Sequence, residues 1–297
     1  MRSTTKNSVD PSNDTKQTAA KAASPAPQDP ASLAIETFGL TRRFGDLTAL
    51  DHLDLRVPYG QIFGLLGPNG AGKSTTIKML ATLLEPSSGT ARVAGFDVVQ
   101  APAEVRRRIG YVPQLVSADG GLTGWENLDF SGRLYGIHSA DRKTRIAEAL
   151  LFVNLSDSAN KLVKTYSGGM IRRLEIAQAM LHRPAVLILD EPTVGLDPVA
   201  RRAVWERLLE LRQTYRMTIL ISTHGMDEAD ELCDQLAILH LGKIAAVGNP
   251  ADLKAAVAPD ATLDDVFARY SGVSIHEGGG TTYRDIRQAR RTASRLG

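Results

Sequence analysis

Nine consecutive residues decide the fold of this chain: Gly67, Pro68, Asn69, Gly70, Ala71, Gly72, Lys73, Ser74 and Thr75. They match the phosphate-binding loop template, which is a glycine, four free positions and then Gly-Lys-Ser/Thr. The apolar run 61–66 before the loop is typical of a short buried strand, and the segment 76–84 after it has the pattern of a helix with no internal Gly or Pro. Strand, glycine loop and helix in this order predict an α/β fold whose loop holds phosphate.

The residue types in the loop suit a polyphosphate. The glycines allow positive φ and let the backbone approach an anion without a Cβ clash. The following helix points its N-terminal N–H groups and its dipole at the same anion. Lys73 is placed for the β- and γ-phosphates, and the Ser74 hydroxyl is placed for Mg²⁺. We therefore expect a nucleoside triphosphate here, because a chance glycine turn before a core helix would not explain a match at every fixed position.

Two carboxylates follow a second apolar run, at 185–189. Such a run is expected of a strand buried on both faces, and it ends in Asp190 and Glu191. Asp190 can hold Mg²⁺ through water, and Glu191 can polarise an attacking water molecule. One carboxylate at a strand end is common, but this pair beside a phosphate loop favours a hydrolytic site.

Two more polar residues stand at the ends of predicted strands. Gln114 ends the strand 109–114, and open α/β sheets bind ligands at that edge. His224 follows the buried strand 217–223, where its imidazole could hydrogen-bond a γ-phosphate.

Two further positions are open to an ordinary structural interpretation. Phe44 offers a ring on which a nucleobase could stack, and a core phenylalanine fits its spacing equally well. Ser167, Gly168 and Gly169 open a helix and present N–H groups to a second anion. A serine cap followed by two glycines is also a common helix start.

Composition limits the possible functions. The chain has 297 residues with 43% apolar side chains, enough for a sizeable core. Its 35 basic and 33 acidic side chains leave a net charge of +2, so we expect no nucleic-acid partner. The single cysteine, Cys233, excludes an internal disulfide and suits a reducing cytosol, where we expect it as a small buried residue. Without an apolar run of spanning length or a secretory signal, any membrane part must belong to another polypeptide.

The pattern also divides the chain. Residues 1–32 have almost no large apolar side chain and predict a disordered tail. Strands are expected at 33–38 and 53–57, and residues 123–160 keep a helical pattern that indicates a helical insertion. After a hairpin near 236–247 we expect two short helices, at 251–257 and 263–270, packed on the main domain. The arginine-rich end is either a solvated tail or a contact for acidic lipid or a partner.

In order and spacing these parts resemble the ATP-binding subunit of an ABC transporter. The loop at 67–75 resembles the Walker A motif of that family, and YSGGM at 166–170 resembles its signature motif. LILDE at 187–191 resembles its Walker B motif with the catalytic glutamate. The remaining matches are the Q-loop at Gln114, the D-loop with Asp197, the switch histidine at His224 and the adenine-stacking aromatic at Phe44.

The resemblance implies an α/β fold: a P-loop NTPase core with a mixed/parallel central sheet, an N-terminal antiparallel β part and an inserted helical subdomain. The ATP-binding domain would cover 33–250, with the helical subdomain at about 122–182 and short helices and a tail at 251–297. ATP and Mg²⁺ would bind with Ser74, Gln114 and Asp190 around the metal. Glu191, His224 and Gln114 would act in catalysis. Ser167, Gly168, Gly169 and Asp197 would come from a second copy in a homodimer.

The resemblance further implies an ATPase on the cytoplasmic face of the membrane that powers a separate permease. Tyr166 and the chain end at 263–272 are similar to the daunorubicin/doxorubicin-resistance type, which suggests export of a drug-like or hydrophobic compound. Tyr166 and Met170 depart from the usual LSGGQ motif, while the phosphate-binding Ser-Gly-Gly is intact. The alternative is a cytosolic, non-transport ATPase of this class, a regulator or ribosome-associated factor. A P-loop small-molecule kinase would not explain Ser167 or His224.

Overall fold

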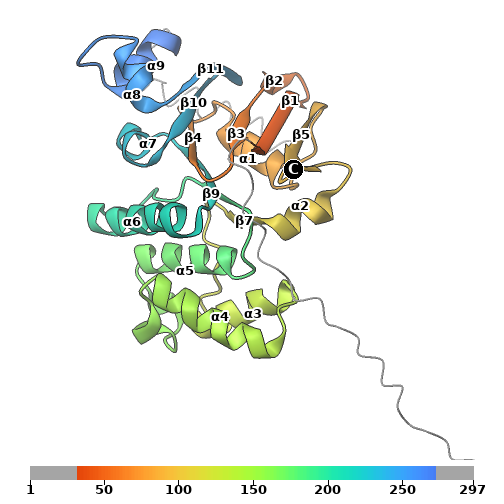
Figure 1. Ribbon diagram of the computed structural model, residues 1–297, viewed down its shortest axis with the longest axis vertical. Helices are drawn as coiled ribbons and strands as arrows, with labels where there is room; N and C mark the ends of the chain where they lie inside the picture. The colour runs from red at the N-terminus through yellow and green to blue at the C-terminus, as the bar shows by residue number, and fades with distance from the viewer. Residues whose placement is uncertain (1–31, 272–297) are drawn as a thin grey trace, which may run out of the picture.

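A computed structural model of the chain describes residues 32–271 (Figure 1). Its central sheet consists of β4 (Ile62–Leu66), β7 (Ile109–Val112), β8 (Val186–Asp190), β9 (Thr218–Thr223), β10 (Gln235–His240) and β11 (Lys243–Gly248). The strand order is β11-β10-β4-β9-β8-β7, and only β11 is antiparallel to its neighbour. Every residue of β4, β8 and β9 is buried, so these strands need apolar side chains on both faces.

A second, antiparallel sheet is formed mainly by residues before and after the phosphate loop. It contains β1 (Leu33–Phe44), β2 (Leu47–Leu53), β3 (Arg56–Pro58), β5 (Ser88–Val93) and β6 (Phe96–Asp97). The order is β2-β1-β5-β6, with β3 also paired to β1. Helix α1 (Lys73–Leu80) packs between the two sheets, and its Ile77, Met79 and Leu80 join a core built from both of them.

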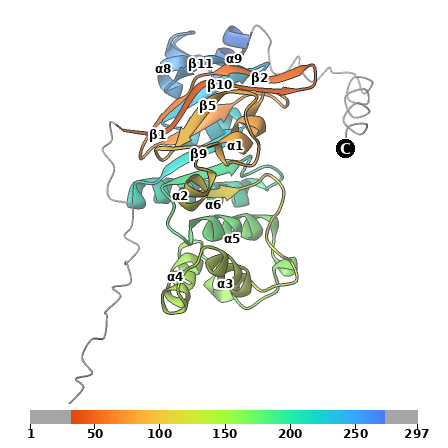
Figure 2. The same cartoon turned by 90° about the vertical axis from the view of Figure 1, so that its right-hand side faces the viewer.

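Three helices form a separate layer: α3 (Gly124–Leu134), α4 (Ser139–Phe152) and α5 (Gly168–Met180). In both views α5 lies between the strands and the pair α3 and α4 (Figures 1 and 2). This layer has a hydrophobic cluster of its own, which includes Leu128, Ile146 and Leu174. Two short 3-10 turns, η1 (Ser156–Ser158) and η2 (Val163–Thr165), connect α4 to α5. The structure thus contains the predicted helical insertion.

The other helices are α2 (Pro102–Arg108), α6 (Pro198–Tyr215), α7 (Met226–Leu232), α8 (Pro250–Ala255) and α9 (Leu263–Ser271). Leu253 of α8 and Leu263, Val266 and Phe267 of α9 belong to the core cluster that also covers one face of the central sheet. This confirms that the last two helices pack on the main domain. Cys233 is buried directly after α7, as expected of a small apolar residue.

Three predicted elements have different boundaries in the structure, for physical reasons. The predicted strand 33–38 is the first half of a 12-residue strand, because β1 pairs with β2, β3 and β5 along its length. The predicted strand 53–57 is instead the end of β2 followed by β3. Helix α1 occupies 73–80 rather than 76–84, because Gly72 caps it at a φ of 106° and Thr82 turns out of it at a φ of 60°.

Some expectations lie outside the described residues: the tail 1–32, except for Ser32, and the arginine-rich end beyond residue 271. Within residues 32–271, no helix has both the length and the apolar content that crossing a membrane requires.

Candidate nucleotide site

The phosphate loop connects the end of β4 to the start of α1, and its conformation depends on glycine. Gly70 and Gly72 have φ values of 84° and 106°, which L side chains rarely adopt. A Cβ at Gly72 would lie 2.9 Å from the Ala49 carbonyl oxygen, and a Cβ at Gly67 would collide with the Leu239 carbonyl oxygen. The loop is therefore held between β2 and β10, with the first N–H groups of α1 at its end.

A cleft of about 320 Å³ opens beside this loop. It brings together residues that are distant in the chain, because β1, β4, β7 and β8 all end at this part of the molecule. Its lining residues are Phe44, Leu47, Ala49, Pro68, Asn69, Gly70, Gly72, Lys73, Ser74, Thr75, Gln114 and Glu191.

Phe44 is 46% exposed at the end of β1, with the Arg42 guanidinium 4.6 Å from its ring centroid. Phe44 is therefore not a core phenylalanine, and its ring faces the cleft.

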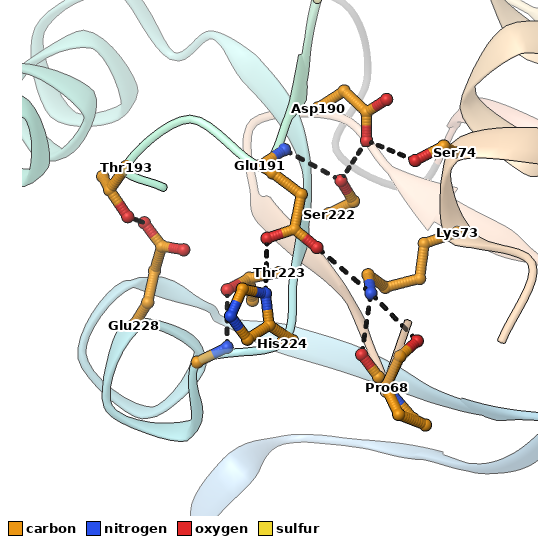
Figure 3. A network of polar contacts seen from close by, with 12 residues as sticks. Pro68, Lys73, Ser74, Asp190, Glu191, Thr193, Ser222, Thr223, His224 and Glu228 are labelled. Carbon is orange, nitrogen blue, oxygen red and sulfur yellow. Dashed lines mark hydrogen bonds and ion pairs between the residues drawn. The ribbon is translucent and has the colours of Figure 1, made fainter. Parts of the chain in front are cut away.

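Lys73, Glu191 and His224 form a chain of charged contacts beside the loop (Figure 3). Lys73 Nζ donates to the carbonyl oxygens of Gly67 at 2.7 Å and Pro68 at 3.2 Å, and lies 3.1 Å from Glu191 Oε1. The other carboxylate oxygen of Glu191 lies 2.8 Å from His224 Nδ1. Lys73 and Glu191 are buried and His224 is half exposed, so the Glu191 carboxylate is oriented from both sides while the imidazole stays accessible.

Asp190 and Ser74 supply oxygen atoms next to this chain of contacts. Ser74 Oγ donates to Asp190 Oδ1 at 3.0 Å, and Ser222 Oγ donates to the same oxygen at 2.6 Å (Figure 3). A hydroxyl and a carboxylate at this separation are hard oxygen ligands of the kind Mg²⁺ prefers. Residues 32–271 contain no cluster of three or more His, Cys, Asp or Glu side chains that could bind a metal alone.

The Ser-Gly-Gly turn lies elsewhere. Ser167 caps α5 by accepting from Met170 N at 3.3 Å, and Asp197 caps α6 by accepting from Ala200 N at 2.9 Å. These two helix starts are neighbours, because a Cβ at Gly169 would lie 2.6 Å from the Ala200 Cβ. Ser167, Gly168 and Asp197 are exposed, and none of the three lines the cleft. The predicted site residues therefore form two groups, one around the phosphate loop and one at the starts of α5 and α6.

The two departures from the usual signature motif have structural partners. Tyr166 is buried, and its hydroxyl donates to the Ser158 carbonyl oxygen at 2.7 Å. A Cβ at Gly124 would collide with that hydroxyl, so the start of α3 is built around it. Met170 packs against the hydrophobic cluster of the helical layer.

Sequence reasoning missed several residues of the site. Leu47 and Ala49 line the cleft, and Ser222 both donates to Asp190 and accepts from the backbone N–H of Glu191. The available signal for Ser222 was a hydroxyl inside an otherwise largely apolar strand. Glu228 of α7 was also missed: its Oε1 accepts from Thr193 Oγ1 at 2.7 Å and from Trp205 Nε1 at 2.9 Å.

Comparison with known proteins gives matches that cover most of the chain. The family model described as ABC transporter matches residues 50–194. The daunorubicin/doxorubicin resistance ATP-binding protein DrrA of Streptomyces peucetius is 46% identical over 255 residues, covering 82% of this chain and 77% of that protein. The Nod factor export ATP-binding protein I of Cupriavidus metallidurans is 45% identical, covering 74% of this chain and 72% of that protein.

Among solved structures, one described as the ATP binding subunit of an ABC transporter is similar with a TM-score of 0.71 and 31% identity. It covers 80% of this chain and 99% of the solved chain.

Proposed function

Because this chain belongs to the family of ABC transporter ATP-binding proteins, we propose that its cleft binds ATP and that hydrolysis there powers a separate membrane permease. The observation that carries the proposal is the Glu191 carboxylate held between Lys73 and His224 at the edge of the phosphate loop. Its position next to the loop suits a base that orients a water molecule toward a γ-phosphate.

The proposal gives each residue of the cleft a role. The adenine stacks on Phe44, and the loop N–H groups with Lys73 bind the β- and γ-phosphates. Ser74, Gln114 and Asp190 would hold Mg²⁺, which would supply charge stabilisation for the transferred phosphoryl group. His224 donates to the γ-phosphate and keeps Glu191 oriented.

Two copies of the chain complete two sites. Ser167 and Gly168 are exposed at the start of α5 next to Asp197, with Gly169 buried behind them, outside the cleft of their own chain. An anion-binding turn that its own cleft does not use is explained if it closes over the nucleotide of a second copy. ATP then favours the closed dimer, because that form binds it more tightly than the open one.

The helical layer offers a surface for the permease. Leu115 and Val116 follow Gln114 and are 81% and 62% exposed, and Leu134 at the end of α3 is 72% exposed. Exposed apolar side chains of this kind favour a protein contact, which would hold the subunit on the cytoplasmic face of the membrane. The relatives named for daunorubicin/doxorubicin resistance and Nod factor export favour export of a drug-like or hydrophobic compound over a non-transport regulator.

A pair of variants tests the assignment of the site. Lys73→Ala should weaken ATP binding at least about tenfold, because it removes the cation at the phosphates. Glu191→Gln should still bind ATP but lower kcat on the order of a hundredfold or more, because the carboxamide is a poor base. Binding is measured with a fluorescent ATP analogue and turnover by phosphate release. Lys254→Ala, which removes a lysine paired with Asp230 away from the cleft, is the control. Wild-type turnover by Glu191→Gln would contradict the role given to Glu191.

A further inference from the structure

Helix α5 carries two charged side chains on its buried face. Arg172 is 6% exposed and Glu175 is 2% exposed, and their Nη1 and Oε2 atoms are 3.0 Å apart. Burial lowers the pKa of Arg172, while the nearby carboxylates of Glu175 and Asp190 raise it. Replacing a buried ion pair by packed apolar residues is often neutral or stabilising, so stability alone does not account for this pair.

Both side chains bind the segment 113–117, which follows β7. Arg172 Nη1 donates to the Pro113 carbonyl oxygen at 2.8 Å, and Nη2 donates to the Gln114 carbonyl oxygen at 3.1 Å. Glu175 Oε1 accepts from the backbone N–H of Ser117 at 2.5 Å and from its hydroxyl at 2.9 Å. Three residues of this short segment, Pro113, Gln114 and Ser117, are thus held by one helix.

The same helix and the same segment reach the two halves of the nucleotide site. Gln114 lines the cleft beside the phosphate loop, while α5 begins at the Ser-Gly-Gly turn. Arg172 lies about one and a half turns from Ser167, a distance over which a hydrogen-bonded helix moves as one piece. A displacement of the Gln114 backbone would therefore be transmitted through Arg172 and along α5 to Ser167.

We propose that Arg172 and Glu175 form a latch that ties the Gln114 segment to α5, so that nucleotide bound beside Gln114 sets the position of the Ser167–Gly169 turn. They are positioning residues, and the inference rests on the proposed ATP-driven dimer. The planar guanidinium reaches two carbonyl oxygens and a carboxylate at once, which the single ammonium of a lysine cannot do in the same geometry.

The test uses Arg172→Lys and Glu175→Gln in the full chain. ATP affinity, kcat and KM are measured in the otherwise wild-type protein, and ATP-dependent dimerisation is measured by light scattering in the Glu191→Gln background. We expect ATP affinity within about twofold of the parent, with dimerisation weakened and kcat lowered by about tenfold or more, because the two half-sites lose their coupling.

The matched control is Arg142→Lys together with Asp129→Asn. Arg142 Nε lies 2.5 Å from Asp129 Oδ1, and the pair joins α4 to α3 in the same layer without touching 113–117. These variants should lower the Tm by a similar amount yet leave kcat and dimerisation near the parent values. A latch variant that lowers only the Tm, with kcat and dimerisation equal to those of the control, would overturn the proposal.

A variant that does not fold and a parent without activity are told apart from a failure of the latch. Glu175→Gln keeps the shape of the side chain, so it decides the question if Arg172→Lys does not fold. Absence of ATP turnover by the wild-type chain, or of a dimer in the Glu191→Gln parent, would refute the proposed function itself. A working parent whose latch variants behave like the control would refute only the latch.

Discussion

Glu191 combines an unusual backbone with a buried charge. Its φ is 50°, in the left-handed region that non-glycine residues seldom occupy, and its N–H donates to Ser222 Oγ at 3.0 Å. This conformation costs on the order of 1–3 kcal/mol and persists only where the surroundings enforce it. Here Ser222, Lys73 and His224 together fix both the backbone and the carboxylate, which places the strain at the residue that we propose as the base.

Tyr166 stands where the usual LSGGQ motif has leucine, and its hydroxyl makes a hydrogen bond that leucine could not make. Because that hydroxyl is buried and bonded to the Ser158 carbonyl oxygen, Tyr166→Phe should lower the free energy of unfolding by about 1 kcal/mol. ATP affinity should not change, since Tyr166 does not line the cleft. Urea unfolding followed by circular dichroism, with ATP binding in parallel, measures both quantities. Unchanged stability with weakened ATP binding would show that the hydroxyl acts on the nucleotide instead.

At the scale of elements, α5 is attached to both ends of β7. Arg172 and Glu175 bind the segment after β7, and His182, two residues beyond α5, binds its first residue: His182 Nε2 lies 3.0 Å from the Ile109 carbonyl oxygen. The imidazole also stacks on Tyr135 with ring centroids 3.7 Å apart. The helix and the strand that leads to Gln114 are thus held as one unit.

Acidification should weaken this attachment. Burial lowers the pKa of His182 to about 4, with a smaller contribution from Arg145, while the bond to Ile109 acts in the opposite direction. Because the unfolded chain takes up this proton near pH 6.5 and the folded chain only near pH 4, stability is lost as the pH falls between those values. At about pH 5.5 the loss from this group should be on the order of 1 kcal/mol.

The measurement compares urea unfolding of the wild type and His182→Phe at neutral and acidic pH. The phenylalanine keeps a ring against Tyr135 but does not titrate. The stability difference between the two proteins should therefore shrink as the pH falls. A constant difference would mean that His182 is not held neutral in the folded chain.

On the scale of the whole molecule, the two groups that we propose to bind phosphate have different surroundings. The loop lies between the two sheets with Phe44 and Glu191, whereas the Ser-Gly-Gly turn lies at the edge of the helical layer beside α6. That layer has a hydrophobic cluster of its own, while α5 also contributes Ile176 and Ala179 to a core cluster of the central sheet. The separation of the two groups is compatible with ATP-dependent dimerisation, in which each site uses one group from each copy.

Ser167 offers a charge test of this arrangement. Asp and Asn cap a helix about as well as Ser, so Ser167→Asp and Ser167→Asn should both fold. In the Glu191→Gln background, the aspartate should abolish ATP-dependent dimerisation, because it sets a carboxylate against the γ-phosphate of the other copy, and the asparagine should retain it. Light scattering with and without ATP measures the outcome. Equal dimerisation by the two variants would place Ser167 away from the phosphate.

Much of this protein can be predicted from its sequence, because the signals are local. Glycines at positions of positive φ, a lysine and hydroxyl at the start of a helix, and apolar runs that end in carboxylates each depend on a few neighbouring residues. Backbone preference and burial pattern act over that same range, so the phosphate loop, the buried strands, Asp190, Glu191 and the helical insertion all follow from it.

Only the tertiary structure decided which of these parts meet. The strand order places the ends of β1, β4, β7 and β8 around one cleft and leaves Ser167 outside. It also brings Ser222 to the Asp190 carboxylate and to the backbone N–H of Glu191. The tertiary structure further brings the buried charged side chains Arg172 and Glu175 of α5 into hydrogen bonds with the segment 113–117. Such contacts join residues tens of positions apart, and they depend on how strands and helices are ordered in space, which no local pattern encodes.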